Sequence, residues 1–404
     1  MPRERGFILP MVIFSLAIMG VLVMVLVSTS DDDRLGSRYD LEGTRSFNAA
    51  EAGLADILTD WKADGYEGTV PLVGSSNVLP WRTLANNGGR YRGTILKVDN
   101  SSYLITVDGQ SAGARKGLRT IQMMLTPVSL GYSVLGGTNV TFTKGNTDSW
   151  DSDAGTYAAT KCDPLVAGSC SGDIWSNGTI TLSGTALIHG DAAAVGAISG
   201  GCPSPWVDGS CTSPAAPAPM PPISCPAPYS PAADVHLAAA GATYSSATGD
   251  FTVGKANGVG GNIDTLQYGN TPYVFHNVTM GGASILYFDG TPQHVDIYIS
   301  GTLDLGGGII SNPSGKPTNL SIWGCGTSTT TWTLSGGPNG TSEAYFAVYA
   351  PKHPITISGG GELFGAVVGA SVNNSGGSQI HYDLALARVP SLVLVPGSWT
   401  EITR

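Results

Sequence analysis

A long apolar run near the N terminus limits most strongly what this chain can fold into. The run carries no charged residue from Phe7 to Ser30 and stops at Asp31, Asp32 and Asp33. A helix of that length rises about 36 Å at about 1.5 Å per residue, which exceeds the roughly 30 Å hydrocarbon core of a bilayer. The sequence therefore predicts a membrane-spanning helix, and we expect it to extend beyond the membrane, over residues 7–62 in all.

The charges that flank this run predict the orientation of the chain. Arg3 and Arg5 outweigh Glu4 on the N-terminal side, and a positive flank of this kind stays in the cytoplasm. We expect a single-pass protein of the inner (cytoplasmic) membrane with its C terminus outside, which later reaches a pilus or the cell surface. No A-x-A-like site closes the run, and the run is longer than the apolar region of a secretory signal peptide. The Gly6–Phe7 junction is therefore the remaining candidate for processing.

Two short motifs carry a resemblance to a known family. Arg5-Gly6-Phe7, directly before the apolar run, resembles the cleavage junction of type IV prepilins. Residues 45–54 (Arg-Ser-Phe-Asn-Ala-Ala-Glu-Ala-Gly-Leu) are similar to the helix of PilX-type pilus assembly proteins. The resemblance implies cleavage after Gly6 by a prepilin peptidase, which leaves residues 1–6 as a leader, and methylation of the new amine of Phe7. It also implies that the partners are the membrane, other pilin subunits and the pilus assembly machinery.

One position departs from the family pattern. Major pilins carry a glutamate five residues into the mature chain, where its carboxylate is thought to meet a neighbouring subunit's terminal amine, and this chain has Met11 there. A lone amine in an apolar core is costly unless it is paired, and a methionine cannot pair with it. The resemblance therefore implies a minor subunit, at the tip of a filament or at a junction, rather than a bulk filament subunit.

Apolar residues at helical spacing continue beyond the apolar run as far as Trp61. Among them, Glu51 stands between small alanines. It could be a buried partner for a basic group on a neighbouring helix, which would make it an assembly residue. It could equally be solvated, as most mid-helix glutamates are.

From about residue 63 the composition changes to Gly, Ser, Thr and Asn. Strand-like runs lie at residues 91–98, 103–107 and 118–125, with turn-forming residues between them. We expect residues 63–128 to form a small pilin-like α+β region, in which an antiparallel sheet packs on the long helix.

Residues 129–404 predict a larger, β-rich head. Glycine accounts for 56 of the 404 residues and charged residues for 12%, about twice and about half the usual shares. An apolar residue followed by Ser-Gly recurs at Leu182-Ser183-Gly184, Ile198-Ser199-Gly200, Ile299-Ser300-Gly301, Leu334-Ser335-Gly336 and Ile357-Ser358-Gly359. A strand that ends in a glycine turn is what a rung of a parallel β-helix or irregular solenoid needs. A β-sandwich is the alternative, although its regular strand spacing is missing.

The predicted fold class is therefore α+β: a long membrane-spanning helix, a small sheet and a mainly β head. Residues 203–231 are about half proline and alanine, which predicts an extended surface loop. Residues 344–365 and 379–386, with His381-Tyr382-Asp383, also resemble a poorly characterised extracellular head domain that is found fused to PilX-type anchors. That resemblance implies no particular activity.

Six cysteines lie in the head, namely Cys162, Cys170, Cys202, Cys211, Cys225 and Cys325. An even number suits disulfides in an oxidising compartment. The pairs Cys162–Cys170 and Cys202–Cys211 are near enough in sequence to close small loops. Cys225–Cys325 would be the third pair by elimination, although six cysteines allow fifteen connectivities.

An oxygen-rich loop is the one candidate metal site. Asp148, Asp151 and Asp153 lie in this loop and could ligate calcium, but the loop lacks the distal bidentate glutamate of an EF-hand, and an ordinary turn explains the same residues. No C-x-x-C motif occurs and the histidines are scattered, so we expect no zinc site and no cofactor.

Charge argues against two of three function classes for the head. A polysaccharide-cleaving enzyme needs cationic groups for acidic sugars, or two carboxylates across the glycosidic bond. The span between Thr120 and Ala387 has no arginine and only five lysines. Five lysines against sixteen acidic residues give this span a charge of −11, whereas nucleic-acid capture needs a basic stripe. Nucleic acid is therefore not an expected partner.

The third class is a structural or adhesive subunit, which needs no catalytic residues, and no nucleophile-elbow motif is visible. Aromatic residues such as Trp175, Trp206, Tyr229 and Tyr273 are candidate surface contacts, although solenoid cores also bury large residues. We expect a non-enzymatic, minor pilin-like subunit whose head serves pilus assembly or adhesion. The alternatives are a signal-anchored envelope protein and a polysaccharide-binding or polysaccharide-cleaving β-helix protein.

Overall fold

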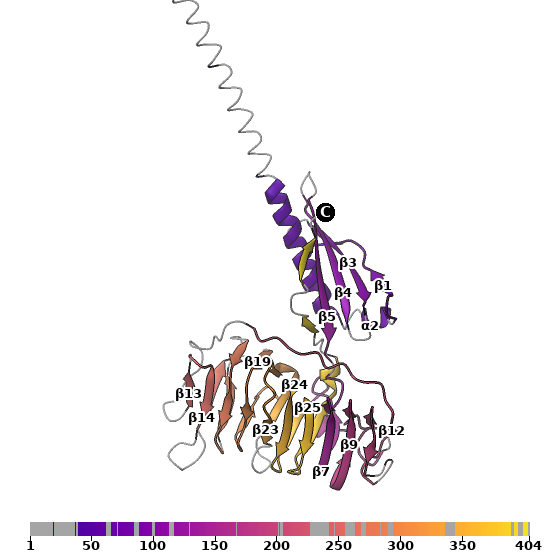
Figure 1. Ribbon diagram of the computed structural model, residues 1–404, viewed down its shortest axis with the longest axis vertical. Helices are drawn as coiled ribbons and strands as arrows, with labels where there is room; N and C mark the ends of the chain where they lie inside the picture. The colour runs from indigo at the N-terminus through magenta and orange to yellow at the C-terminus, as the bar shows by residue number, and fades with distance from the viewer. Residues whose placement is uncertain are drawn as a thin grey trace, which may run out of the picture. The chain divides into compact units, whose positions relative to one another are not determined.

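The computed structural model divides the chain into two compact units, unit 1 with residues 1–125 and 394–404 and unit 2 with residues 126–393 (Figure 1). It describes residues 19, 37, 39–61, 66–70, 72–84, 89–98, 102–112, 117–128, 130–166, 168–200, 202, 205–226, 242–245, 247–254, 263–267, 272–282, 284–289, 294–335, 344–388, 392–394 and 399–402.

The predicted α+β class is wrong, because the described residues form a mainly β fold. Residues 39–59 are helical, and the two other α-helices, α2 (Tyr66–Thr69) and α3 (Tyr157–Thr160), are single turns. Among the residues described, no helix is both long enough and apolar enough to cross a membrane. Most of residues 7–38, on which the expected span was based, lie outside the described residues. Alternating strand patterns dominate the rest of the chain, so strands define its class.

Unit 1 contains an antiparallel sheet. Its strands are β1 (Ser76–Val78), β2 (Arg82–Thr83), β3 (Arg90–Lys97), β4 (Tyr103–Gln110), β5 (Leu118–Pro127), β27 (Leu392–Leu394) and β28 (Thr400–Ile402). The three long central strands confirm the runs predicted from the sequence. Because side chains alternate along a strand, every second residue faces the helical residues 39–59, as in Ile95, Ile105 and Val107, which are fully buried.

Glycines let the helical residues lie directly on this sheet. A Cβ atom at Gly53 would stand 2.3 Å from Cγ of Tyr91, and one at Gly109 would stand 2.2 Å from the backbone oxygen of Ser46. The Tyr91 hydroxyl donates a hydrogen bond to Oδ2 of Asp56 at 2.9 Å. Backbone and side chains therefore meet at distances that leave no space for a methyl group at either glycine.

Unit 2 is inserted between two strands of unit 1. The chain leaves unit 1 along β5 and returns to the same sheet at β27 and β28; Thr400 of β28 pairs with Gln122 of β5. We expected the head to run to residue 404, but residues 394–404 belong to unit 1. The head is therefore connected to the sheet at both of its ends.

Unit 2 stacks its strands mainly in parallel, which is the pairing of a solenoid and not of a β-sandwich. The strands are β6 (Val134–Gly136), β7 (Asn139–Trp150), β8 (Ile174–Ser176), β9 (Thr179–Ile188), β10 (Ala192–Ala194), β11 (Ile198–Ser199), β12 (Cys211–Thr212), β13 (Ala242–Ser245), β14 (Asp250–Val253), β15 (Ile263–Gln267), β16 (Tyr273–Phe275), β17 (Val278–Met280), β18 (Ile285–Asp289), β19 (Val295–Ile299), β20 (Leu303–Asp304), β21 (Ile309–Ser311), β22 (Leu320–Gly324), β23 (Trp332–Ser335), β24 (Ala344–Ser358), β25 (Glu362–Asn374) and β26 (Gln379–Asp383), with 3₁₀ turns η1 (Pro317–Asn319) and η3 (Leu384–Ala387).

The chain begins this stack in its middle. From β6 and β7 it builds rungs toward one end, where β10 pairs with β12. It then resumes with the antiparallel hairpin of β13 and β14 and returns rung by rung. Finally, β25 pairs with β6 and β7, and β26 pairs with β7. The first and last rungs in the sequence are thus neighbours, and we call the contact between them the seam.

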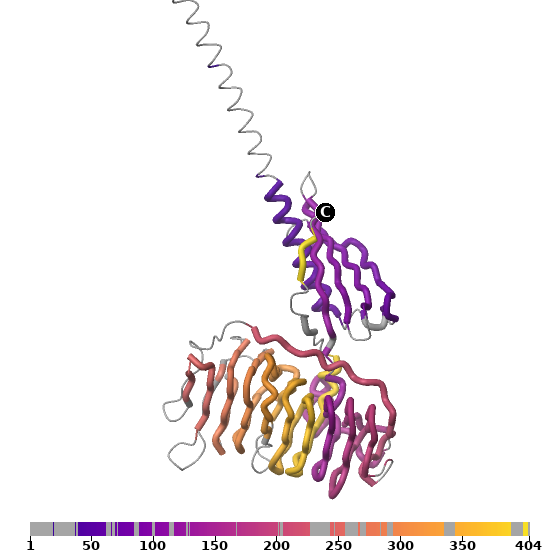
Figure 2. Tube along the Cα trace, in the orientation of Figure 1, coloured from indigo at the N-terminus to yellow at the C-terminus, as the bar shows by residue number. Residues whose placement is uncertain are grey.

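In the segment that links the two halves of the stack, the structure describes residues 213–226, which we call the strap. It runs along the stack from the β12 end toward the β13 end (Figure 2). The side chain of Asn177 exchanges two hydrogen bonds with the backbone of Ala218, at 2.8 and 2.7 Å. The Tyr349 hydroxyl donates to the backbone oxygen of Pro221 at 2.8 Å. This part of the predicted surface loop is therefore fastened to the stack, and Ala218 is only 8% exposed.

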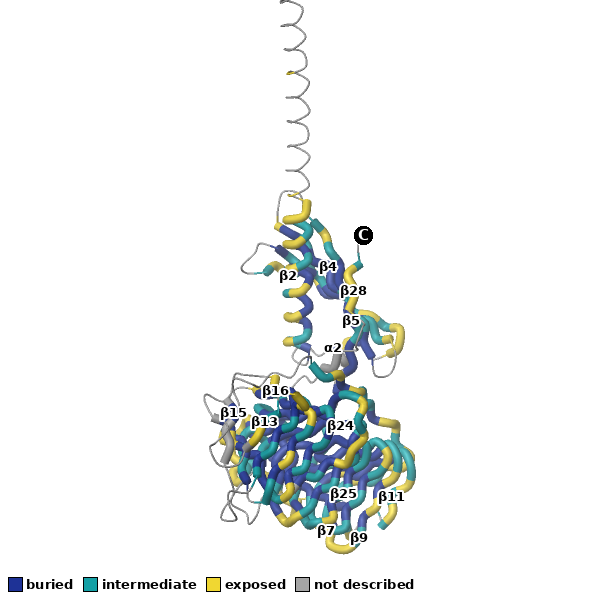
Figure 3. Tube along the Cα trace, turned by 60° about the vertical axis from the view of Figure 1, so that its left-hand side comes forward, coloured by how far each residue is buried: buried dark blue, intermediate teal, exposed yellow. Residues whose placement is uncertain are grey.

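The inward side chains of unit 2 form one continuous apolar core. Figure 3 colours the buried residues of the stack dark blue. Its largest fully buried members include Phe142, Phe251, Phe346 and Trp332. Of the five Ser-Gly motifs, those at Gly184, Gly200 and Gly359 have the positive φ expected of a glycine turn, and Gly301 does not. Gly336 lies outside the described residues.

Candidate functional site

The seam gathers the charged and titratable side chains that the sequence singled out in the head. Asp148 of β7 pairs in register with His381 of β26, and Trp150 pairs with Asp383. Arg388 follows η3 directly. Groups that are more than 230 residues apart in the sequence therefore come together, because the first and last rungs are neighbours.

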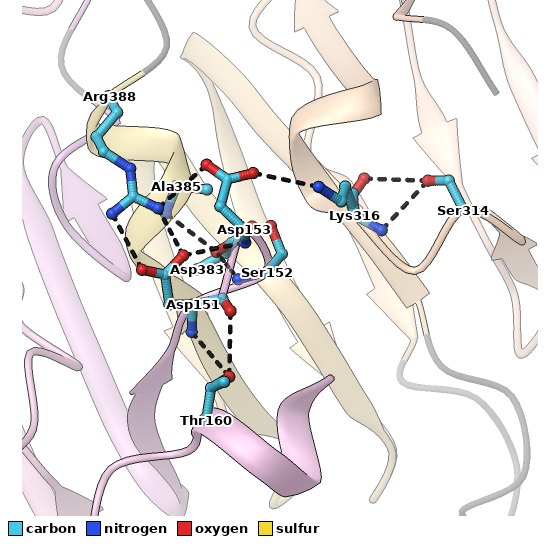
Figure 4. A network of polar contacts seen from close by, with 9 residues as sticks. All are labelled: Asp151, Ser152, Asp153, Thr160, Ser314, Lys316, Asp383, Ala385 and Arg388. Carbon is cyan, nitrogen blue, oxygen red and sulfur yellow. Dashed lines mark hydrogen bonds and ion pairs between the residues drawn. The ribbon is translucent and has the colours of Figure 1, made fainter. Parts of the chain in front are cut away.

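One part of the seam is a cluster of opposite charges (Figure 4). The Arg388 guanidinium donates to both carboxylate oxygens of Asp151 and, at 3.2 Å, to Asp153. The Lys316 ammonium lies 3.2 Å from the other oxygen of Asp153. The hydrogen bond from Arg388 lowers the pKa of Asp151, and the two carboxylates raise the pKa of Arg388. Two cations and two anions thus neutralise one another across the seam.

A second part of the seam is built on Asp148. Its Oδ1 lies 2.6 Å from Nδ1 of His381, and its Oδ2 accepts a hydrogen bond from the Tyr157 hydroxyl at 2.6 Å. The His381 ring contacts Tyr157 and Phe364, at centroid distances of 4.4 and 4.6 Å, and these two rings contact each other at 5.1 Å. Burial, and then the hydrogen bond to Asp148, raise the pKa of Tyr157. Because His381 is 1% exposed, its ring orients Asp148 inside the fold and does not face solvent.

Asp383 links the last rung to the residues that follow the first. Its Oδ1 accepts hydrogen bonds from the backbone nitrogens of Ser152 and Ala385, both at 3.0 Å, so it caps η3 and ties it to the first rung. Burial raises the pKa of this carboxyl group. Its Oδ2 has no hydrogen-bond partner among the described residues, which makes the charged form costly there.

The proposed calcium ligands do not converge on one point. Asp148 faces His381 and Tyr157, whereas Asp151 and Asp153 face Arg388. Within the part of the chain that the structure describes, no group of three or more histidine, cysteine, aspartate or glutamate side chains is placed to hold a metal ion. The carboxylates act as partners for cationic and hydroxyl groups of the protein itself.

The six cysteines form the pairs favoured by their spacing, Cys162–Cys170, Cys202–Cys211 and Cys225–Cys325. The first closes the loop after α3. The third links the end of the strap to the residue that follows β22. There Ile223, 7% exposed, also forms a parallel bridge with Cys325.

The other candidate residues are scattered or lie outside the described residues. Glu51 is exposed, with no partner among the contacts of the described residues, which fits the solvated alternative. Gly6, Phe7 and Met11 lie outside the described residues. Among the aromatic candidates, Tyr273 is fully buried and so is not a surface contact. Trp206 and Trp175 are half-buried, and Tyr229 is outside the described residues.

Sequence reasoning missed Arg388, Lys316 and Tyr157 as members of the seam. One signal was present for Arg388, because it is the first arginine after a span without any. Arginine suits bidentate ion pairs with carboxylates, and the span before Arg388 is rich in acidic residues. The partner itself could not be read from the sequence, since it lies on the opposite side of the insertion.

Comparison with known proteins gives limited matches. A family model described as a domain of unknown function (DUF7305) matches residues 233–389, which contain the strands of the last rung but not those of the first. Among proteins of curated function, none matches this sequence. Among solved structures, the chain is similar to the competence-associated pilin ComZ from Thermus thermophilus, at 14% identity over 89% of this chain and 97% of that one. The TM-score is 0.26, at which a shared fold is not established.

Proposed function

We propose that this chain is a minor pilin-like structural subunit that displays a braced β-solenoid head for pilus assembly or adhesion. The observation that carries the proposal is the double connection of the head, which enters from β5 and returns to β28, two paired strands of one sheet. A load on the head reaches the sheet through two chain segments instead of one. Such a connection suits a domain that bears load when it contacts a partner subunit or a surface.

The chemistry of the seam supports a structural role. Arg388, Asp151 and Asp153 neutralise one another, and His381 is buried against Asp148. A hydrolase or lyase would need such groups directed at a substrate. Here they join the first rung to the last, so we propose no catalytic activity for them.

The location is also a proposal. The three disulfides suit an oxidising compartment outside the cytoplasm. The resemblance of residues 5–7 and 45–54 to pilin motifs supports maturation by a prepilin peptidase and incorporation beside other pilin subunits. The same resemblance, with Met11 in place of the family glutamate, supports a tip or junction position.

The first test is the N terminus of the mature protein. The full chain is expressed with and without a prepilin peptidase, and its N terminus and methylation state are read by mass spectrometry. A peptidase-dependent chain that starts at methylated Phe7 supports the proposal. A Gly6→Val variant is the matched control and should keep residues 1–6. Retention of residues 1–6 by the wild type would instead favour a signal-anchored envelope protein.

The second test concerns the head. A chain in which a short turn replaces residues 128–391, between β5 and β27, removes the solenoid and retains both the sheet strands and the processing motif. This chain should still be processed but should lose attachment to surfaces in an adhesion assay, or fail to support pilus assembly. Unchanged attachment and unchanged pilus numbers would reject the head as the functional part.

A further inference from the structure

One histidine of the head is completely buried and lies apart from the charged groups of the seam. His353 belongs to β24, at the point where the register of its pairing with β25 shifts between Ala350 and Pro354. Its exposed fraction is 0%. Histidine is the side chain whose charge ordinarily changes between about pH 5 and pH 8. A histidine at this depth therefore makes the structure around it sensitive to pH.

Hydrogen bonding fixes which nitrogen of the His353 ring carries the proton. Nδ1 lies 2.9 Å from the backbone oxygen of Thr330, and a carbonyl oxygen only accepts, so Nδ1 is the donor. In the neutral ring Nε2 then carries the lone pair. Nε2 is buried and has no hydrogen-bond partner among the described residues. The neutral ring fits this site, whereas a proton on Nε2 would be a buried donor without an acceptor.

The residues around His353 do not compensate a positive charge. β22 contributes Gly324 and β23 contributes Trp332, whose ring centroid is 4.7 Å from that of His353, and neither residue titrates. The charged group that acts on His353 within the described part of the chain is its neighbour Lys352, which has the same sign. Burial lowers the pKa of His353 more than the hydrogen bond to Thr330 raises it, and the charge of Lys352 lowers it further.

The loop that binds His353, residues 326–331, is held by few contacts. Its sequence is Gly-Thr-Ser-Thr-Thr-Thr, with no charged and no large apolar side chain, and its last three residues are exposed. The Thr330 hydroxyl donates to the backbone oxygen of Gly301 at 3.0 Å, and Nζ of Lys352 donates to that of Gly326 at 2.9 Å. A segment that buries so little apolar surface opens at a low cost in free energy.

The same loop begins beside the anchor of the strap. Cys325 forms the disulfide with Cys225, and the backbone nitrogen of Gly326 donates to the backbone oxygen of Ile223 at 3.1 Å. A movement of the 326–331 loop is therefore transmitted to the end of the strap. The disulfide keeps the strap attached to the stack during such a movement.

We propose that His353 is an acid-sensitive latch, whose protonation opens the 326–331 loop and loosens the adjoining end of the strap. The protonated ring gains hydration only when it leaves its site, which breaks the hydrogen bond to Thr330 and the contact with Trp332. The opening is local and reversible, because the seam and the disulfides remain in place. The latch does not depend on the processing or the adhesive role proposed above.

Proton linkage sets the sign and the size of the effect. In the open loop His353 titrates near the ordinary histidine pKa of about 6.5, whereas in the closed loop it stays neutral to a lower pH. Protons therefore bind preferentially to the open form, and opening becomes easier as pH falls below about 6.5. Between pH 7.5 and pH 5.5 the opening equilibrium constant should rise about tenfold.

Hydrogen exchange followed by mass spectrometry tests the latch on the full chain in a non-ionic detergent. Exchange of the protected amides in residues 324–334 is compared at pH 7.5 and pH 5.5, after correction for the intrinsic pH dependence of exchange. The corrected rate of the wild type should rise about tenfold at pH 5.5. Residues 103–110 are the internal reference and should change less than twofold, because unit 1 contains no histidine.

Two variants assign the response to one side chain. His353→Asn retains a donor for the backbone oxygen of Thr330 but does not titrate, so its corrected rates at the two pH values should differ by less than threefold. His276→Asn removes an exposed histidine of the same head and should retain the tenfold rise. If His353→Asn exchanges faster at both pH values, the ratio of the two rates still reports the titration.

The wild type alone is able to overturn the proposal. A rise of less than threefold in residues 324–334, or an equal rise in residues 103–110, would reject a local latch without any variant. A rise of threefold or more that persists in His353→Asn would assign the response to another group and would also reject it. Loss of the rise in His276→Asn would do the same.

Discussion

Arg388 and Asp151 are 237 residues apart in the sequence, and the guanidinium of Arg388 donates from both Nη atoms to the two carboxylate oxygens of Asp151. Asp151 follows the first rung of the solenoid and Arg388 follows the last. This pair therefore spans the whole insertion in sequence while it joins two neighbouring rungs in space. The seam therefore joins the two rungs from which the chain connects to unit 1, the first through the segment before β6 and the last through the segment after η3.

Removing this pair should weaken the head slightly. Arg388→Gln should lower the free energy of unfolding by about 0.5–1 kcal/mol at neutral pH and low salt, the usual size for a partly exposed ion pair. Added salt should shrink the difference. Urea unfolding followed by tryptophan fluorescence measures it. Lys316→Gln, which removes one exposed contact with Asp153, is the control and should have a smaller effect; equal effects would contradict the assigned role.

The two aspartates of the seam should respond to pH in opposite directions. The pKa of Asp151 is lowered in the fold, so its contribution is present above the unfolded pKa and is lost as pH falls through the folded pKa. The pKa of Asp383 is raised, so stability falls as pH rises from the unfolded pKa of about 3.9 through the folded value. Relative to wild type, Asp383→Asn should therefore gain stability as pH rises above about 3.9, and Asp151→Asn should lose stability as pH rises toward about 3.9 from below. Urea unfolding in steps from pH 2 to pH 7 tests the signs, and parallel curves would disprove them.

The disulfide between Cys225 and Cys325 should matter more than the short one at Cys162–Cys170. It closes a loop with a sequence separation of 100, against 8 for the other. In the chain-entropy description, the corresponding stabilisation is about 4–5 kcal/mol against about 2–3 kcal/mol. Double serine variants of each pair, compared by urea unfolding, measure the order. A larger loss for Cys162→Ser/Cys170→Ser would show that the strap contributes little.

Gly53→Ala should destabilise unit 1 although alanine favours helices. Helix propensity alone would add about 1 kcal/mol of stability. The new Cβ would stand 2.3 Å from Cγ of Tyr91, and overpacking of this kind typically costs about 1–3 kcal/mol. Thermal unfolding should show a lower midpoint. Gly360→Ala, which has no atom within 4 Å, is the control and should unfold within a degree or two of wild type.

Local patterns predicted local structure well. The alternation of residues 91–98 and 103–107 predicted β3 and β4, because the period of a strand is visible in a few residues. The Ser-Gly motifs indicated solenoid turns, and Gly184 and Gly359 have the expected positive φ. The cysteine spacing favoured the pairs that form.

Long-range order was not predictable in the same way. Nothing in residues 134–150 indicates that their neighbour is residues 362–383, since both are ordinary strands. The α+β class was wrong because the prediction gave the N-terminal helix more weight than the many short strands of the head. Asp151 and Asp153 were candidates for either calcium ligands or an ordinary turn, because the sequence shows their oxygens but not their partner Arg388, which is 237 and 235 residues away in the chain.

The position of β6 and β7 in the middle of the stack has a consequence for synthesis. Their partners on one side, β25 and β26, follow about 210 residues later in the chain. At about 5–20 residues per second, the ribosome takes roughly 10–40 s to make that stretch. During this time the edge of β7 remains open as a template for other strands. A nascent chain of this protein thus has a defined vulnerable period, which ends only when the last rung has been translated and has paired with the first.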